Sequence, residues 1–215
     1  MLAELPALWF RPHERVVALV KEVEGLDAAL AAHAQGRPVV FLTPHMGCFE
    51  VAAQYAASRM PITVLYRPPK IGWLEPLMHE GRARPNVRLV PADVSGVRAV
   101  LAALKRGESA GFLPDQVPGE GEGEWAEFFG RPAYTMTLAA RLAEREGVQC
   151  FLAYARRLPR GEGYAIAIRP YPEAQAQEKP VRRLNRALEA LVRECPGQYL
   201  WGYNRYKTPK GAKPQ

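Results

Sequence analysis

Residues 38–58 read PVVFLTPHMGCFEVAAQYAAS. Their apolar start, residues 38–43, predicts a short strand that is buried on both faces. Pro44 and Gly47 suit a turn, and a helix is expected over residues 48–58. A buried strand that runs through a short turn into a helix is typical of an α/β domain.

The same alternation continues on both sides of this segment. We expect strands at residues 18–23, 38–43, 62–66, 87–90, 109–113, 149–155 and 164–169, and helices at 27–34, 48–58, 74–82, 96–105, 135–146 and 181–194. Asp27 is a candidate helix N-cap, and Gly107 and Gly147 are candidate helix stops. Residues 119–125, GEGEGEW, predict a mobile loop, and residues 208–215 predict a frayed tail.

Length and composition limit the class of protein. The chain has 215 residues, 48% hydrophobic and 24% charged, which excludes disordered and fibrous classes. We expect a single domain over residues 1–215. The chain has no run of about 18 apolar residues, so no transmembrane helix is predicted, and the absence of a signal peptide favours a cytoplasmic location. The three cysteines and four histidines are too scattered for a disulfide framework or a zinc site, so no metal and no cofactor are expected.

The net charge of +7 and the pI near 9.5 indicate attraction to anionic partners. Phospholipid head groups, phosphorylated glycolipids, an acidic carrier protein and nucleic acid all meet this description, and charge does not choose among them. A bias toward arginine codons in the genome explains the same surplus without any partner.

His45 and Glu50 form the first candidate catalytic pair, at the end of a predicted strand, where α/β sheets bind ligands. Residues five apart do not share a face of one helix, so the two side chains meet only if His45 lies in the turn before the helix. An imidazole oriented by a carboxylate is a good general base near neutral pH. The alternative is a loop histidine with an incidental glutamate.

Other polar side chains follow predicted strands or helices. Arg67, Asp115 and Gln116 come after strands, and Arg82 and Arg84 lie at a helix end. An arginine in these places binds a phosphate or an oxyanion, or else complements the helix dipole or caps a strand. Asp after Pro is also an ordinary turn residue.

Three apolar or aromatic segments have two interpretations each. Phe128 and Phe129 either line an acyl tunnel or pack in the core. Trp201, Tyr203, Arg205, Tyr206 and Lys207 interleave aromatic and basic side chains as at a membrane interface, although single-stranded nucleic acid also stacks on such surfaces. Residues 1–20 contain many apolar side chains and, if exposed, form an amphipathic segment able to lie on a bilayer. Pro6 and Pro12 interrupt any long helix there.

A set of short motifs carries a family resemblance. The motifs are TPHMG (43–47), YRP (66–68), GRAR (81–84), LPDQ (113–116), FFG (128–130) followed by Thr135, and QYLW (198–201). Together with the H-x4-E spacing of His45 and Glu50, they resemble the bacterial lipid A biosynthesis late acyltransferases, the lauroyl/myristoyl branch of the glycerolipid acyltransferases. They occur in the family's order over residues 20–207.

The resemblance implies a fold and a reaction. The fold is a mixed, largely parallel central sheet flanked by helices, similar to glycerol-3-phosphate acyltransferase. The reaction moves an acyl chain from acyl carrier protein or coenzyme A to a hydroxyl of a lipid A precursor, an anionic lipid, at the cytoplasmic face of the inner membrane. In the lipid A branch this hydroxyl is the 3-hydroxyl of an acyl chain already on the phosphorylated disaccharide. We expect no nucleic-acid partner. The family normally begins with an N-terminal membrane anchor, whereas Met1–Pro6 resembles the family's interior, as in a truncated chain, a misplaced start or an anchorless homologue, so we expect this form to be peripheral.

Carried over residue by residue, His45 is the base, Glu50 its partner, Arg82 the functional arginine and Asp115 the later acidic residue. Whether Glu50 or Asp115 orients His45 stays open. Arg67, Arg84, Gln116, Phe128 and Phe129 are the substrate-binding candidates. The family often has Asn and Trp where this chain has Cys48 and Phe49, and we expect these two departures to alter the acceptor pocket.

Three other functions compete with this interpretation. In the first, the acceptor is another glycolipid or a phospholipid. Cys48 beside His45 would make a thioesterase, because a helix N-terminus lowers a thiol pKa. A module that binds anionic lipid or RNA without chemistry would need only the basic surface.

Overall fold

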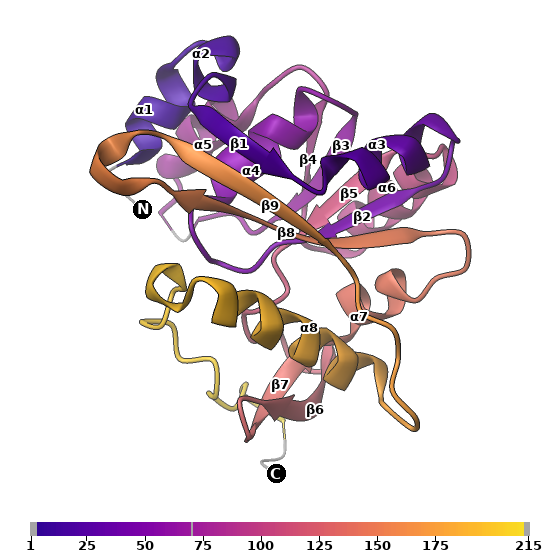
Figure 1. Ribbon diagram of the computed structural model, residues 1–215. Helices are drawn as coiled ribbons and strands as arrows, with labels where there is room; N and C mark the ends of the chain where they lie inside the picture. Colours follow the sequence, from indigo (N-terminus) through magenta and orange to yellow (C-terminus); the bar gives the residue numbers. More distant parts are fainter. Residues whose placement is uncertain (1–3, 70, 213–215) are drawn as a thin grey trace.

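Seven strands form a central mixed sheet in the computed structural model, which describes residues 4–69 and 71–212 (Figure 1). The strand order is β1-β9-β8-β2-β5-β3-β4. All neighbours pair in parallel except β8 and β9, which are antiparallel. This confirms the expected α/β fold with a largely parallel sheet. The strands are β1 (Val20–Glu24), β2 (Val39–Leu42), β3 (Ile62–Tyr66), β4 (Val87–Pro91), β5 (Ser109–Phe112), β8 (Gln149–Arg157) and β9 (Tyr164–Pro170).

Helices connect the strands and cover both faces of the sheet. They are α1 (Leu5–Phe10), α2 (His13–Val17), α3 (Leu26–Ala34), α4 (Phe49–Ala57), α5 (Leu74–Arg82), α6 (Val94–Lys105), α7 (Thr137–Ala143) and α8 (Pro180–Glu194), with short 3-10 turns η2 (Pro159–Gly161) and η3 (Pro196–Gln198). Within residues 4–69 and 71–212, none of the helices has both the length and the apolar character that crossing a bilayer needs.

Each face of the sheet has its own core, because successive side chains of a strand point to opposite faces. Val40 and Leu42 of β2 pack with α6, α7 and α8, in what we call the α8-side core. Val39 and Phe41 pack with α1 to α5, in what we call the α4-side core. Figure 1 shows α7 and α8 on one side of the strands and α1 and α2 on the other.

A two-stranded hairpin begins within the mobile loop expected at residues 119–125, so that prediction was wrong from Gly123 onward, while residues 119–122 form a turn outside the strands. Strands β6 (Gly123–Phe128) and β7 (Arg131–Met136) pair antiparallel and pack on α8. Glycine alternates with glutamate up to Glu124, so the last pair of the run already lies in β6. From Trp125 onward, cross-strand pairing such as the ring contact between Trp125 and Tyr134 stabilises the hairpin.

The helix ends differ in part from the expectations. Asp27 is not the N-cap of α3, because Gly25 holds that position with a left-handed backbone, φ 79°. Gly107, φ 76°, directly follows the C-cap of α6 as expected. Gly147 does not end α7, whose C-cap is Glu144. Two short helices also form in the N-terminal segment, where Leu8 and Val16 are buried rather than free to contact a bilayer.

We expect Leu184→Ala to lower the free energy of unfolding by about 3 kcal/mol, within the range for buried leucines. Leu184 lies in α8 and is fully buried in the α8-side core. Urea unfolding followed by circular dichroism measures the change. The exposed Arg193→Ala variant is the control and should change it by less than about 0.5 kcal/mol. Equal effects of the two variants would contradict the assigned packing of α8.

Candidate functional site

The site lies where β2 and β5 end side by side. The two strands pair in parallel from Val39 with Ser109 to Leu42 with Phe112, and the Thr43 N–H donates to the Phe112 carbonyl at 2.9 Å. Parallel pairing brings the segments that follow both strands to the same edge of the sheet, although they are about seventy residues apart in the chain. Loops at this edge are where α/β proteins bind ligands.

His45 and Asp115 meet at this edge. The His45 ring Nδ1 lies 2.8 Å from Asp115 Oδ1, and the His45 backbone N–H donates to Oδ2 at 2.9 Å. Asp115 is buried, so its carboxylate is fixed by these two bonds. A carboxylate only accepts hydrogen bonds, so Nδ1 carries the proton and Nε2 keeps its lone pair in the neutral ring. The Gln116 side-chain nitrogen lies 3.3 Å from that Nε2.

A second segment holds the His45 loop from the C-terminal part of the chain. The Leu200 N–H donates to the His45 carbonyl, and the Gly47 N–H donates to the Gln198 carbonyl, both at 2.9 Å. Met46 and Tyr199 form an isolated bridge between these two bonds. The QYLW motif is therefore a clamp on the His45 loop, which its sequence alone did not reveal.

Gly47 is required by the same loop. Its φ is 56°, in the left-handed region, and a Cβ built there would lie 2.0 Å from the Ala155 carbonyl oxygen. The next residue, Cys48, donates its N–H to that oxygen at 2.7 Å. The loop thus runs so close to β8 that only glycine fits.

Glu50 pairs with Arg82 rather than with His45. Arg82 Nε donates to both Glu50 oxygens, at 2.9 and 3.1 Å, and Nη2 also donates to Oε1. Glu50 lies in the first turn of α4 and Arg82 in the last turn of α5, so the ion pair joins the two helices. The expectation that Glu50 orients His45 is therefore wrong. The imidazole points toward Asp115, which follows β5, and the Glu50 side chain points toward Arg82 at the end of α5.

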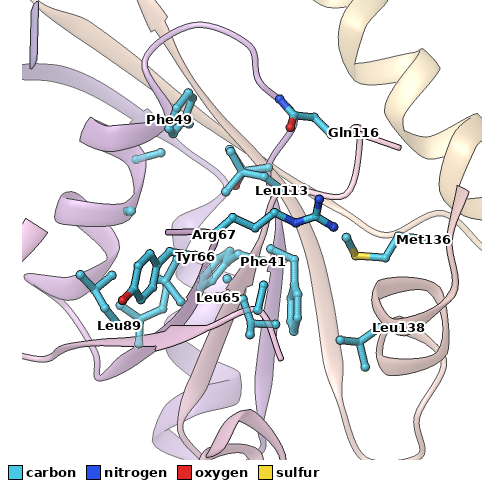
Figure 2. A pocket seen from close by; sticks show the side chains of 18 of the residues that line it. Phe41, Phe49, Leu65, Tyr66, Arg67, Leu89, Leu113, Gln116, Met136 and Leu138 are labelled. Atoms are coloured by element: carbon cyan, nitrogen blue, oxygen red, sulfur yellow. The ribbon is translucent and has the colours of Figure 1, made fainter. Parts of the chain in front are cut away.

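A cavity of about 1140 Å³ opens at the carboxyl edge of the sheet. Most of its lining is apolar, and His45, Glu50, Arg67, Arg82 and Gln116 are polar residues in its wall. Figure 2 shows Gln116 and Leu113 at one end and the Arg67 side chain in the middle. Arg67 is mostly exposed and lies 3.7 Å from Glu122. Such an apolar cavity with a few converging polar groups is a typical ligand site.

Three predicted substrate-binding residues do not line this cavity. Arg84 donates to the Gln54 side chain and to the carbonyls of Leu8 and Trp9, and so anchors α1 to α4. Phe128 is 1% exposed and belongs to the α8-side core. Phe129 packs against it from the side. These residues support the fold, and the tunnel interpretation of the two phenylalanines does not agree with the structure.

The aromatic and basic C-terminal segment is mostly internal. Arg205 is 3% exposed and donates to the Tyr134 carbonyl and to Thr135 Oγ1, while burial lowers its pKa. Tyr206 donates to the Phe128 carbonyl, and Tyr203 accepts from the Val117 N–H. Among the named aromatic residues, Trp201 is exposed. Residues 201–207 therefore do not form a continuous belt that faces a membrane.

Cys48 lies beside the histidine in sequence but points into the α4-side core. It is 1% exposed, and burial raises the pKa of its thiol. A thiol in this state is a poor nucleophile, which argues against the thioesterase alternative. Within residues 4–69 and 71–212, histidine, cysteine and acidic side chains form no group of three that could hold a metal ion.

Comparison with known proteins gives one consistent result. The profile of the family described as bacterial lipid A biosynthesis acyltransferase matches residues 1–208. The chain is 29% identical to the lipid A biosynthesis palmitoleoyltransferase of Escherichia coli K12 over 210 residues, which is 96% of this chain and 68% of that protein. It is 28% identical over 218 residues to the lipid A biosynthesis lauroyltransferase of the same strain, covering 98% and 69%.

We expect Arg82→Ala to destabilise the protein by about 3 kcal/mol, because it leaves the buried Glu50 carboxylate without its partner. The double variant with Glu50→Gln should recover more than half of this loss. Thermal and urea unfolding measure both. An Arg82→Ala effect below about 0.5 kcal/mol would place the ion pair among weak surface pairs.

Cys48 should resist alkylation in the native protein. Because the thiol is buried and its pKa is raised, iodoacetamide at pH 8 should modify it at least about tenfold more slowly than in urea-unfolded protein. Peptide mass spectrometry resolves the three cysteines, and the partly exposed Cys195 is the internal control. Modification of Cys48 faster than Cys195 would restore it as a candidate nucleophile.

Proposed function

The chain belongs to the bacterial lipid A biosynthesis acyltransferase family, and on this premise we propose that His45 is the general base of its acyl transfer to a lipid A precursor. The chain is an O-acyltransferase of the late lipid A type. We propose that the donor is an acyl thioester of acyl carrier protein or coenzyme A. The acceptor supplies a hydroxyl group.

The observation that carries the proposal is the orientation of His45. Asp115 fixes the proton on Nδ1, so Nε2 presents its lone pair beside an apolar cavity. In the proposed step, Nε2 removes the acceptor hydroxyl proton while that oxygen attacks the thioester carbonyl carbon. The carbon–sulfur bond then breaks, and the imidazolium returns its proton to the thiolate. Asp115 stabilises the imidazolium between the two proton transfers.

Glu50 and Arg82 act in this proposal as positioning residues. Their ion pair joins the first turn of α4 to the last turn of α5. Helix α4 follows directly on the His45 loop, so fixing its first turn fixes one end of the loop. The Gln198–Leu200 clamp fixes the loop from the other side.

The cavity and the surface charge suit the two substrates. Apolar side chains dominate the cavity wall, as an acyl chain requires. The net charge of +7 favours a phosphorylated lipid and an acidic carrier over neutral partners. We propose that the reaction takes place at the cytoplasmic face of the inner membrane, where both substrates meet.

We expect His45→Ala to lower the transfer rate by about 10²–10⁴-fold, the usual contribution of a general base. Asp115→Asn should cost at least about 10²-fold, because the amide can no longer fix the reactive tautomer. The assay gives the purified protein a lipid extract with acyl carrier protein or coenzyme A thioester, and mass spectrometry detects one added acyl chain.

The matched control is His33→Ala, which removes a histidine bonded to the Gly107 carbonyl away from the cavity. It should retain activity within about twofold, since surface changes are usually small. Transfer that survives His45→Ala would overturn the base assignment. No transfer by the wild-type chain with either donor would favour a binding module or a different substrate.

A further inference from the structure

The cavity extends along both faces of strand β3. Ile62, Val64, Leu65 and Tyr66 all line it, yet successive side chains of a strand point to opposite faces. Val64 and Tyr66 pack against the α4-side core, and Leu65 packs against the α8-side core. The lining residues therefore lie on both faces of the sheet, and we divide the cavity at the carboxyl end of β3 into two lobes, one on each face.

We name the lobes by the helices that close them. The α4 lobe is lined by apolar residues of α4, α5, β3 and β4, namely Ala53, Met78, Val64 and Leu89. The α7 lobe lies on the other face and is lined by Leu65, Val97, Phe112, Met136 and Leu138. Figure 2 shows Tyr66 and Leu89 on one side, Met136 and Leu138 on the other, and the Arg67 side chain between them.

The two lobes differ in charge. In the α4 lobe, Arg82 is neutralised by Glu50. The α7 lobe is bordered by the exposed Arg98 and Arg141, neither of which forms a salt bridge with any part of the chain that the structure describes. Asp93 and Glu122 also border the cavity and carry negative charge, but Asp93 caps α6 by accepting the Gly96 N–H, and Glu122 lies 3.7 Å from Arg67. The free cations thus lie at the α7 lobe.

Size also favours two occupants. The cavity holds about 1140 Å³, above the range of about 300–1000 Å³ typical of a site for one small molecule. An acyl transferase must bring two substrates to one base, and when the acceptor is a lipid both carry apolar chains. Both lobes open at the carboxyl edge, where His45 and Gln116 line the same cavity.

We propose that the α7 lobe binds an apolar chain of the acceptor lipid, with Arg98 and Arg141 near its anionic head group, while the α4 lobe holds the acyl chain of the donor. This assignment rests on the proposed acyl transfer to a lipid. It makes Leu138 a determinant of acceptor recognition and Ala53 a determinant of donor chain length.

Two variants fill one lobe each. Leu138→Trp should raise the acceptor KM about tenfold and leave donor KM and donor chain preference within about twofold, since a filled pocket rejects a chain by about 1–3 kcal/mol. Ala53→Phe should shift the preferred donor to a shorter chain and leave the acceptor KM within the same limit. Arg98→Glu with Arg141→Glu should raise the acceptor KM in a salt-dependent way. Circular dichroism and thermal unfolding check that each variant is folded.

The assignment is wrong if Leu138→Trp changes donor chain preference, or if both variants act on the same substrate. Binding of a fluorescent fatty acid, which needs no turnover, separates this result from failure of the proposed function. Wild-type protein should bind two molecules and each variant one. One molecule bound by the wild type would overturn the two-lobe assignment even if acyl transfer occurs. Two molecules bound without any transfer would contradict the proposed reaction but not the two binding lobes.

Discussion

The parallel pairing of β2 with β5 is the constraint on which the site depends. It ends both strands at the same level, and the Thr43–Phe112 bond extends the pairing into the two loops. His45 and Asp115 then meet with both a ring contact and a backbone bond to one buried carboxylate. A carboxylate fixed in this way holds the imidazole in one orientation as long as the two loops keep their places.

The rest of the domain keeps the His45 loop in the geometry that this pairing sets. Gly47 passes within contact of β8, and Gln198 and Leu200 bond the loop from the C-terminal part of the chain. The Glu50–Arg82 ion pair holds the helix that follows. Each contact joins the loop to a different element, so a change in any of them is felt at the histidine.

Sequence reasoning identified the fold class, nearly all of the sheet and the candidate base, because these follow from local patterns. The β3 strand and the α5 helix were predicted with their observed bounds, 62–66 and 74–82. The partner of His45 was not predictable from spacing. Both Glu50 and Asp115 were candidates, and the choice depends on β2 and β5 being neighbours, which is a property of strand order rather than of either motif. The β6–β7 hairpin was missed because its stability comes from cross-strand contacts and packing on α8.

The two-lobed cavity follows from the same strand order. β3 lies between β5 and β4, and its last residue, Tyr66, accepts the Ala92 N–H through its carbonyl, so β3 and β4 end together at the carboxyl edge. A cavity at that edge can reach both cores, whereas one at the centre of a sheet would be confined to a single face. A sheet that brings a histidine to such an edge gives one base access to two apolar chains on opposite faces. The arginines at the α7 lobe, which form no salt bridge with the described residues, then assign the chain of the anionic acceptor to that lobe and leave the α4 lobe to the donor chain.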